Sequence, residues 1–239
     1  MTKPRSEPAE PKGKLDAMTT LAVTALDVAR ADGGAVNGPE DPDWDAIDWP
    51  RAQTQVDRLR QRIFKASREG DLAKVRNLQR LMLRSHANTL TSVRRVTERN
   101  RGRSTAGVDG QVALTSSARA RLAGQLHRHA RPGRPLPVLR VFIPKQGKKG
   151  VRRPLGIPVI ADRAQQQRVR NALEPEWEAR FEPRSYGFRP GRGCHDAIVA
   201  IHETAKGDRC RRLWVADCDL SKAFDKIDHS ALLAPGLLT

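Results

Sequence analysis

The sequence predicts an α+β fold, in which helices come first and a β-hairpin, further helices and one apolar strand follow. Three observations support this prediction. Apolar residues recur at helical spacing between residues 49 and 82. Two runs rich in branched residues, 138–145 and 151–158, flank a Gly/Lys turn, which is typical of a hairpin. A third apolar run, 213–218, leads directly into a group of carboxylates.

The charge of the chain indicates the class of its partner. The 239 residues include 44 Lys and Arg against 27 acidic residues, and the net charge of +17 favours a polyanion. An anionic membrane is the alternative, but no apolar stretch approaches the roughly 20 residues of a membrane span. No signal-like segment opens the chain, so we expect a cytoplasmic protein without a membrane partner. Three scattered cysteines fit reduced thiols better than disulfides or a zinc site.

The order of the first elements follows from their capping residues. Residues 1–45 mix Pro, Gly, Ala and acidic residues without sustained periodicity, and we expect a disordered tail. A helix should begin at Asp48, which can cap it before a proline in the first turn. Gly70 should end this helix, and Asp71 should cap a second, antiparallel one. The outer faces of the pair are either a solvated surface or an RNA contact, and they carry Arg58, Arg60, Arg62, Lys65, Lys74, Arg76, Arg80 and Arg84.

A basic segment and a glycine-rich loop follow these helices. Five of the ten residues from 94 to 103 are Arg, and residues 100–110 contain three glycines. Such a loop brings the backbone close to phosphate, although any Gly-rich turn has this composition. The predicted nucleic-acid-binding residues here are Arg94, Arg95, Arg99, Arg101, Arg103, Thr105 and Gly107.

The hairpin carries basic residues at its mouth. An antiparallel pair can direct Lys145 and Arg153 at one triphosphate, Lys as a compact charge and Arg as a fork of matched donors. The alternative is a surface hairpin whose lysines keep it soluble.

Two helices and a compact turn come next. One helix should open at Asp162 and another at Pro175. Residues 185–192 then hold two aromatics, two arginines and two glycines, which suits stacking on bases and gripping phosphates. We expect Tyr186 and Phe188 to point into the core, and Arg189 and Arg192 toward nucleic acid. A helix over 195–202 should pack on the strand that follows.

The carboxylates after the apolar strand predict a cation site. Asp219 ends the strand, and Asp217 lies on the same face of an extended chain. A carboxylate near a buried strand is costly unless it binds a cation. The alternative is an ordinary helix cap.

Residues 219–229, Asp-Leu-Ser-Lys-Ala-Phe-Asp-Lys-Ile-Asp-His, closely resemble the first palm block of reverse transcriptases of the group II intron type. Four such blocks occur in family order over about residues 46–234, including Thr-x-Gly-x-Asp-Gly at 105–110 and Arg-Pro-Leu-Gly-Ile-Pro at 153–158. The resemblance implies an RNA-directed DNA polymerase and intron maturase with RNA template, intron RNA, DNA primer and dNTP as partners.

The resemblance also implies the site residues. Asp219 and the Leu220 carbonyl would bind the catalytic Mg2+ of the complete enzyme, Lys145 and Arg153 the phosphates of the incoming nucleotide, and Phe224 its sugar. It further implies a right-hand polymerase, with a helical extension at 46–112, fingers at 113–212 and the start of the palm at 213–239.

One departure from the family matters. The family has a second catalytic block, an aromatic-x-Asp-Asp hairpin, but this chain contains no Asp-Asp pair and its one tyrosine is Tyr186. A helix does not easily pass Pro235-Gly236 either, so we expect a truncated chain that is inactive alone. Two functions stay open: the N-terminal part of a polymerase and maturase, or a non-catalytic RNA-binding module derived from one.

Overall fold

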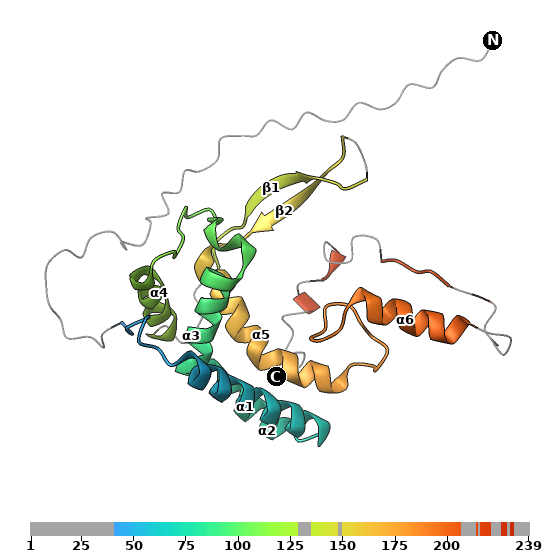
Figure 1. Ribbon diagram of the computed structural model, residues 1–239, viewed down its shortest axis with the longest axis horizontal. Coiled ribbons are helices and arrows are strands. Elements are labelled where there is room, and N and C mark those ends of the chain that lie inside the picture. The colour runs from blue at the N-terminus through green and yellow to red at the C-terminus, as the bar shows by residue number, and fades with distance from the viewer. Residues whose placement is uncertain are drawn as a thin grey trace, which may run out of the picture. The chain divides into compact units, whose positions relative to one another are not determined.

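The computed structural model describes residues 41–128, 135–147, 150–206, 214, 216–220, 226–228 and 230–231. All of them belong to the second of two compact units, which spans Glu40–Thr239. Within these residues the structure is mixed: helices dominate, and one two-stranded antiparallel sheet lies between them in the sequence (Figure 1). The predicted α+β class is confirmed.

The first two helices form as predicted. Helix α1 (Trp49–Arg68) begins at Asp48, whose carboxylate accepts a hydrogen bond from the Arg51 amide at 2.9 Å. Gly70 adopts a φ of +74°, a left-handed conformation that glycine reaches at little cost, and ends the first helical segment. Asp71 then caps α2 (Leu72–Arg84) through the Lys74 amide. The two helices pack against each other through a shared apolar core that includes Val56, Ile63, Val75, Leu78 and Met82.

The next segments complete a helical body. Helix α3 (His86–Arg94) continues into a π-helical turn (Arg95–Arg99) and a 3-10 turn (Arg101–Ser104), and helix α4 (Ser116–Arg128) packs against α3. Helix α4 was not predicted from the sequence. Trp44 is only 3% exposed, and its indole nitrogen donates to Glu98 at 2.9 Å. Residues 41–45, which the prediction included in the tail, therefore belong to this body, whereas residues 1–40 lie outside the described part of the chain.

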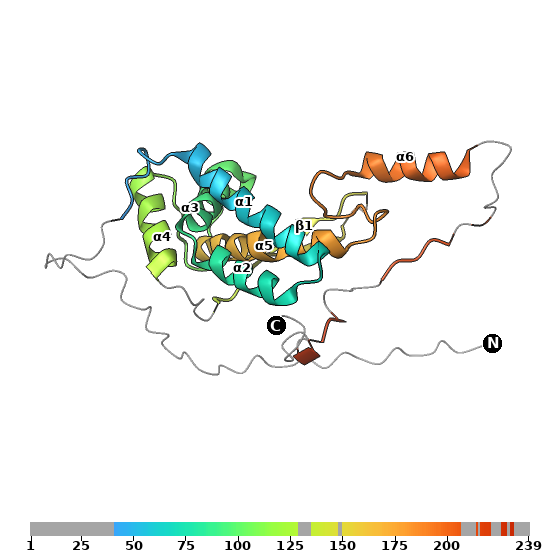
Figure 2. The ribbon, with the colours of Figure 1, turned by 90° about the horizontal axis from the view of Figure 1, so that it is seen from below.

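Helix α5 (Ile160–Arg180) corrects the prediction of two helices in this region. It runs through Pro175 without interruption and packs against α1, α2 and α3 (Figure 2). A proline inside a helix removes one hydrogen bond and costs about 3 kcal/mol. Contacts on both sides of Pro175 offset this cost, because Glu174 pairs with Arg60 at 2.6 Å and the Glu176 carbonyl accepts from the Ser67 hydroxyl at 3.1 Å.

Buried polar groups join α5 to its neighbours. The side chain of Arg168 is 1% exposed and donates to the carbonyls of Leu83 and Leu126 at 2.6 and 3.0 Å. Asn88, fully buried in α3, donates to the Arg168 carbonyl and accepts from the Asn171 amide at 2.8 Å. Such groups are tolerated in a core because most of their polar atoms are hydrogen-bonded; Arg168 Nε is the exception here, with no partner among the described residues. They fix the register of α3 against α5.

The predicted hairpin is confirmed. Strand β1 (Leu139–Pro144) pairs antiparallel with β2 (Arg152–Ile157), with Leu139 opposite Ile157 and Ile143 opposite Arg153. The ladder extends one step further, because the Lys145 amide donates to the Val151 carbonyl at 2.8 Å.

The C-terminal part differs from its prediction. Helix α6 (Cys194–Ala205) forms over the expected residues, but it contains no buried residue. In the apolar run 213–218, the described residues 214 and 216–218 have no regular secondary structure, and Trp214 is exposed. The predicted strand is therefore not formed in these residues. A single strand with no neighbour to pair with is not stable in water, which accounts for the difference.

Candidate nucleic-acid interface

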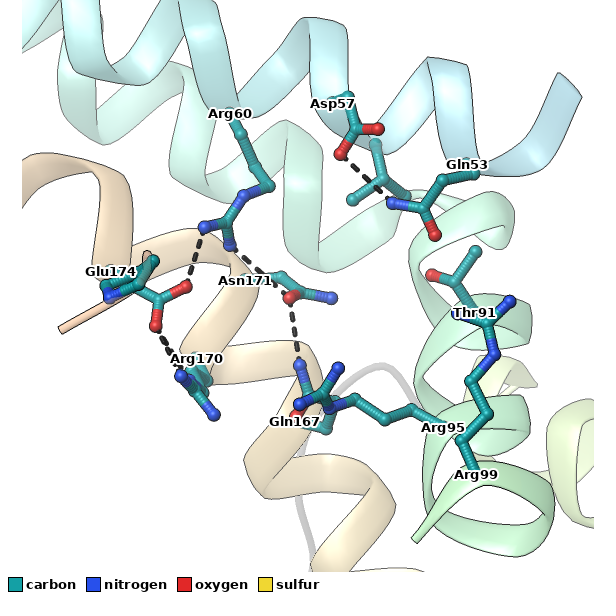
Figure 3. Close-up of a pocket in the computed structure, with 12 residues that line it drawn as sticks. Gln53, Asp57, Arg60, Thr91, Arg95, Arg99, Gln167, Arg170, Asn171 and Glu174 are labelled. Carbon is teal, nitrogen blue, oxygen red and sulfur yellow. Dashed lines mark hydrogen bonds and ion pairs between the residues drawn. The ribbon is translucent and has the colours of Figure 1, made fainter. Parts of the chain in front are cut away.

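A polar groove of about 310 Å³ lies where α1, α3 with its π-helical turn, and α5 meet (Figure 3). We call it the inner groove. Its lining includes four arginines and two carboxylates, which leaves an excess of two positive charges. It is formed by Gln53, Val56, Asp57, Arg60, Thr91, Arg95, Arg99, Gln167, Arg170, Asn171, Glu174 and Pro190.

One wall of the inner groove is held rigidly by hydrogen bonds. Glu174 accepts from Arg60 and from Arg170, each at 2.6 Å. Burial by itself raises the pKa of the Glu174 carboxyl, but these two guanidinium groups outweigh burial and hold the pKa below its usual range. Gln167 donates to Asn171 at 3.0 Å, and Asn171 is bonded to the buried Asn88. The wall is thus continuous with the polar network of the helical core.

The opposite wall carries two arginines that have no side-chain partner among the described residues. Arg95 and Arg99 are exposed residues of the π-helical turn, and their side chains extend into the groove (Figure 3). Neither has an ion pair or a side-chain hydrogen bond to any other described residue. A guanidinium presents several donors in a planar fork that matches phosphate oxygens. The groove therefore offers two uncompensated forks beside a fixed polar wall, which suits an anionic ligand.

The other arginines of the basic segment have different surroundings. Arg94 pairs with Glu98 at 3.1 Å and lies over the Trp49 ring at 4.3 Å, so it contributes to the body. Arg103 is exposed and donates to the Glu98 carbonyl at 2.9 Å. Arg101 is exposed and has no side-chain partner among the described residues. The segment thus contains both structural arginines and arginines that are available to a ligand.

Arg163 anchors the glycine-rich loop, a role that the sequence analysis did not assign. Its guanidinium donates to the carbonyls of Pro158 and Gly102, both at 2.9 Å, and to the carbonyl of Thr105. Gly107 is buried against Val159, and a Cβ at this glycine would lie 2.6 Å from the Val159 Cα. The loop is therefore pinned to the start of α5. The signal in the sequence was weak, because Arg163 lies about 60 residues from the Gly102 and Thr105 carbonyls.

In the turn at 185–192, Phe188 and Arg189 have the reverse of the expected orientation, whereas Tyr186 and Arg192 are both partly buried. Arg189 is 8% exposed, pairs with Glu178 at 2.6 Å and donates to the carbonyls of Glu182 and Ser185. Phe188 is fully exposed, with a φ of +59° that non-glycine residues rarely adopt. The expectation of aromatics inside and arginines outside is wrong for this pair. The reason is that a guanidinium with enough acceptors can be buried at low cost.

These contacts give Arg189 a structural role in the free chain. Its hydrogen bond holds the pKa of the Glu178 carboxyl below the usual range. Arg192 donates to the Pro183 carbonyl at 2.5 Å and lies 5.7 Å from the centre of the Tyr186 ring. That Arg189 and Arg192 also contact nucleic acid stays a prediction.

The hairpin register places the two predicted phosphate ligands on one face. Arg153 is opposite Ile143, and Lys145 lies two residues after Ile143, hence on the same side of the strand. Lys145 and Arg153 are therefore diagonal neighbours across the pair, close enough for long side chains to reach a common ligand. Neither side chain has a partner among the described residues.

The predicted metal ligands lie in the C-terminal part. Asp219 and Leu220 are exposed and belong to the irregular segment 216–220, while Phe224 lies outside the described residues. Across the described ranges, no group of three His, Cys, Asp or Glu side chains could hold a metal ion. A carboxylate and a carbonyl are oxygen ligands of the kind that Mg2+ prefers, but Mg2+ takes about six. These two residues can therefore supply part of a ligand set and not a whole one.

Comparison with known proteins identifies the family. The family described as the N-terminal domain of reverse transcriptase matches residues 44–126, and reverse transcriptase (RNA-dependent DNA polymerase) matches residues 143–236. Protein YkfC of Escherichia coli is 40% identical over 162 residues, which cover 65% of this chain and 42% of YkfC. The group II intron-encoded protein LtrA of Lactococcus lactis is 42% identical over 99 residues, 41% of this chain and 16% of LtrA.

A plant protein is also similar: the mitochondrial nuclear intron maturase 1 of Arabidopsis thaliana is 38% identical over 76 residues, 32% of this chain and 10% of the maturase. The chain belongs to the reverse transcriptases of the group II intron type, as its sequence blocks predicted. It spans less than half the length of these relatives. No helix in the described part of the chain is long and apolar enough to cross a bilayer.

Proposed function

We propose that the chain binds RNA template and intron RNA as the N-terminal part of a group II intron-encoded RNA-directed DNA polymerase and maturase. The observation that carries this proposal is the pair Arg95 and Arg99, which face the inner groove without partners among the described residues. Both guanidinium groups can bind a ligand without first breaking an ion pair to another described residue. The net charge of +17 attracts an RNA backbone to the chain, and we propose that it acts in the cytoplasm.

The second part of the proposal concerns the hairpin of β1 and β2, to which we assign binding of the incoming nucleotide. Lys145 and Arg153, on one face of the hairpin, bind the triphosphate of an incoming dNTP in the complete enzyme. Asp219 and the Leu220 carbonyl contribute oxygen ligands at the metal site, and Phe224 packs against the sugar. Magnesium bound there supplies the neutralising charge that phosphoryl transfer to a DNA primer requires. The shared face of Lys145 and Arg153 supports this assignment.

A non-catalytic RNA-binding module is the alternative, and one observation favours it. The inner groove is formed entirely by α1, α3, α5 and the turns beside them, so RNA binding there needs nothing from residues 213–239. Both functions therefore begin with the same interface, and they differ in whether the residues of the hairpin and the palm block take part in catalysis.

RNA binding is tested by charge removal in the inner groove. Arg95→Gln with Arg99→Gln removes two phosphate contacts, so we expect RNA affinity to fall about 10- to 100-fold at moderate salt. The slope of log affinity against log salt should decrease by about 2. Fluorescence anisotropy with a labelled RNA at several salt concentrations measures both quantities.

The matched control is Arg51→Gln with Arg121→Gln, which removes the same charge from exposed positions outside the groove. Equal losses in the two double variants would show that the groove has no special part in binding. Wild-type affinity that does not change with salt would contradict the proposal as a whole.

Catalysis is tested separately. The 239-residue chain contains no Asp-Asp pair, so we expect no extension of a DNA primer on an RNA template with Mg2+ and dNTPs. Primer extension on a gel is the measurement. Extension that Asp219→Ala abolishes would show that this chain holds a working metal site and would contradict the expected inactivity.

A further inference from the structure

Helix α1 also lines a second groove, on its other side. It contributes Gln53, Val56, Asp57 and Arg60 to the inner groove, and Gln55, Arg58, Leu59 and Arg62 to the second one. An α-helix turns by about 100° per residue, so these two sets of side chains leave the axis in nearly opposite directions. The two grooves therefore open on opposite sides of α1. We call the second one the outer groove.

The outer groove is strongly basic. It has a volume of about 330 Å³ and lies between α1 and α2, where Arg58, Arg62 and Arg84 surround Leu59 and Leu81. The remaining lining residues are Gln55 and Ser85, so no carboxylate is present among the described lining residues. None of the three arginines has an ion pair or a side-chain hydrogen bond to another residue in the described ranges. Three positive charges thus share one hollow, and no described carboxylate compensates them.

Such an arrangement is unfavourable in the free chain. Arg58 and Arg62 are one helical turn apart, and like charges at this spacing destabilise a helix. Some other cations of the same two helices have a nearby carboxylate, because Arg60 pairs with Glu174, and Glu69 lies near both Lys65 and Lys74. An anion in the outer groove would remove the repulsion and bind several guanidinium forks at once. A chain of phosphates provides such an anion at each step along its backbone.

We propose that the outer groove binds the phosphate backbone of a second RNA segment, so that one chain holds two RNA segments on opposite sides of α1. The proposal rests on the proposed function for the class of ligand and adds a second site and a bridging activity. A membrane surface fits the outer groove less well, because the arginines surround a hollow between two helices and a bilayer binds a protruding apolar face.

The experiment counts RNA segments per chain. Native mass spectrometry of the full chain with a short RNA duplex, about 12 base pairs long, gives the stoichiometry. Energy transfer between donor- and acceptor-labelled duplexes shows whether the chain brings two of them together. We expect two duplexes per wild-type chain, together with energy transfer. The triple variant R58Q/R62Q/R84Q should bind one duplex, with a first dissociation constant within about threefold of wild type and no transfer.

Two further variants make the result specific. R51Q/R68Q/R121Q removes the same charge from exposed positions that line neither groove, and it should still bind two duplexes. R95Q/R99Q should bind one duplex, through the outer groove. Thermal unfolding of each variant shows whether it folds, since all these side chains are on the surface and should leave the melting temperature within a few degrees of wild type.

Several outcomes would overturn the proposal. Two duplexes bound to R58Q/R62Q/R84Q would show that the outer groove is not the second site. Loss of the second duplex in R51Q/R68Q/R121Q as well would show that its binding depends on total charge and not on the outer groove. One duplex on the wild-type chain, lost in R95Q/R99Q, would remove the second site and leave the proposed function standing. Binding to phosphatidylserine vesicles that requires Arg58, Arg62 and Arg84, without a second duplex, would assign the outer groove to a membrane.

Discussion

The helical body formed by α1 to α5 and the C-terminal part from α6 onward differ in how they are stabilised. In the body, Ile63 is 0% exposed, and buried polar groups such as Asn88 and Asn171 are hydrogen-bonded to each other in the core. In the C-terminal part, α6 has no buried residue, and Ile201 is 68% exposed. The body therefore carries its own core, whereas α6 presents apolar side chains with no described surface to cover them. The candidate nucleic-acid interface lies in the part with the core, and the predicted metal ligands lie in the other.

The largest expected effect is the loss of stability when a buried isoleucine of the helical body is replaced by alanine. The same substitution in the C-terminal part is the comparison. Ile63→Ala deletes a fully buried side chain and should lower the free energy of unfolding by about 2 to 5 kcal/mol. Ile201→Ala removes an exposed side chain and should change it by less than about 0.5 kcal/mol. Urea unfolding followed by circular dichroism measures both. A loss of similar size at Ile201 would mean that α6 is packed in solution, and the contrast between the two parts would fail.

A smaller effect is expected where the glycine-rich loop meets α5. Gly107→Ala places a Cβ 2.6 Å from the Val159 Cα, so the backbone has to shift, at a cost of about 1 to 3 kcal/mol. Gly187→Ala is the matched control, because a Cβ there meets nothing within 4 Å. Melting temperatures of the two variants provide the comparison. Equal melting temperatures would show that the loop is not held against α5 by this close approach.

Features of the fold that depend on residues close together in the sequence could be predicted from the sequence. Features that depend on contacts between distant segments could not. The starts of α1 and α2 were predicted because Asp48 and Asp71 cap helices within three residues of themselves. The hairpin was predicted because its turn lies within the same short segment. The continuity of α5 through Pro175 was missed, because the contacts that offset the proline come from α1, more than 100 residues earlier.

The candidate site follows the same rule. Arg95 and Arg99 were predicted from local composition, but the wall they face was not, because Arg60, Gln167 and Asn171 come from separate segments. Hydrophobicity alone predicted a buried Phe188 and an outward Arg189, and the carboxylate and carbonyls that reverse this order became visible only in the fold. Composition identified the ligand class, whereas the fold determined which arginines remain available to bind it.

The smallest expected effect is a pH dependence of the helical body. His86 at the start of α3 and His127 near the end of α4 contact edge to face, with ring centres 4.8 Å apart. Arg168 of α5, hydrogen-bonded to the Leu126 carbonyl, places a positive charge at this junction. Burial lowers the pKa of both imidazoles, and the charges of His86 and Arg168 lower the pKa of His127 further. Protonation therefore opposes the packing of α4.

The direction of the pH effect follows from these lowered pKa values. Below about pH 6.5, the ordinary value for histidine, the unfolded chain binds protons that the folded chain does not, so stability falls as the pH decreases. We expect the melting temperature to fall from pH 7.5 to pH 5.5, and to fall less in His127→Gln. His195→Gln, at an exposed position of α6, controls for the loss of a histidine. A wild-type melting temperature that is constant or rises over this range would show that the two imidazoles accept protons in the folded body as readily as in water.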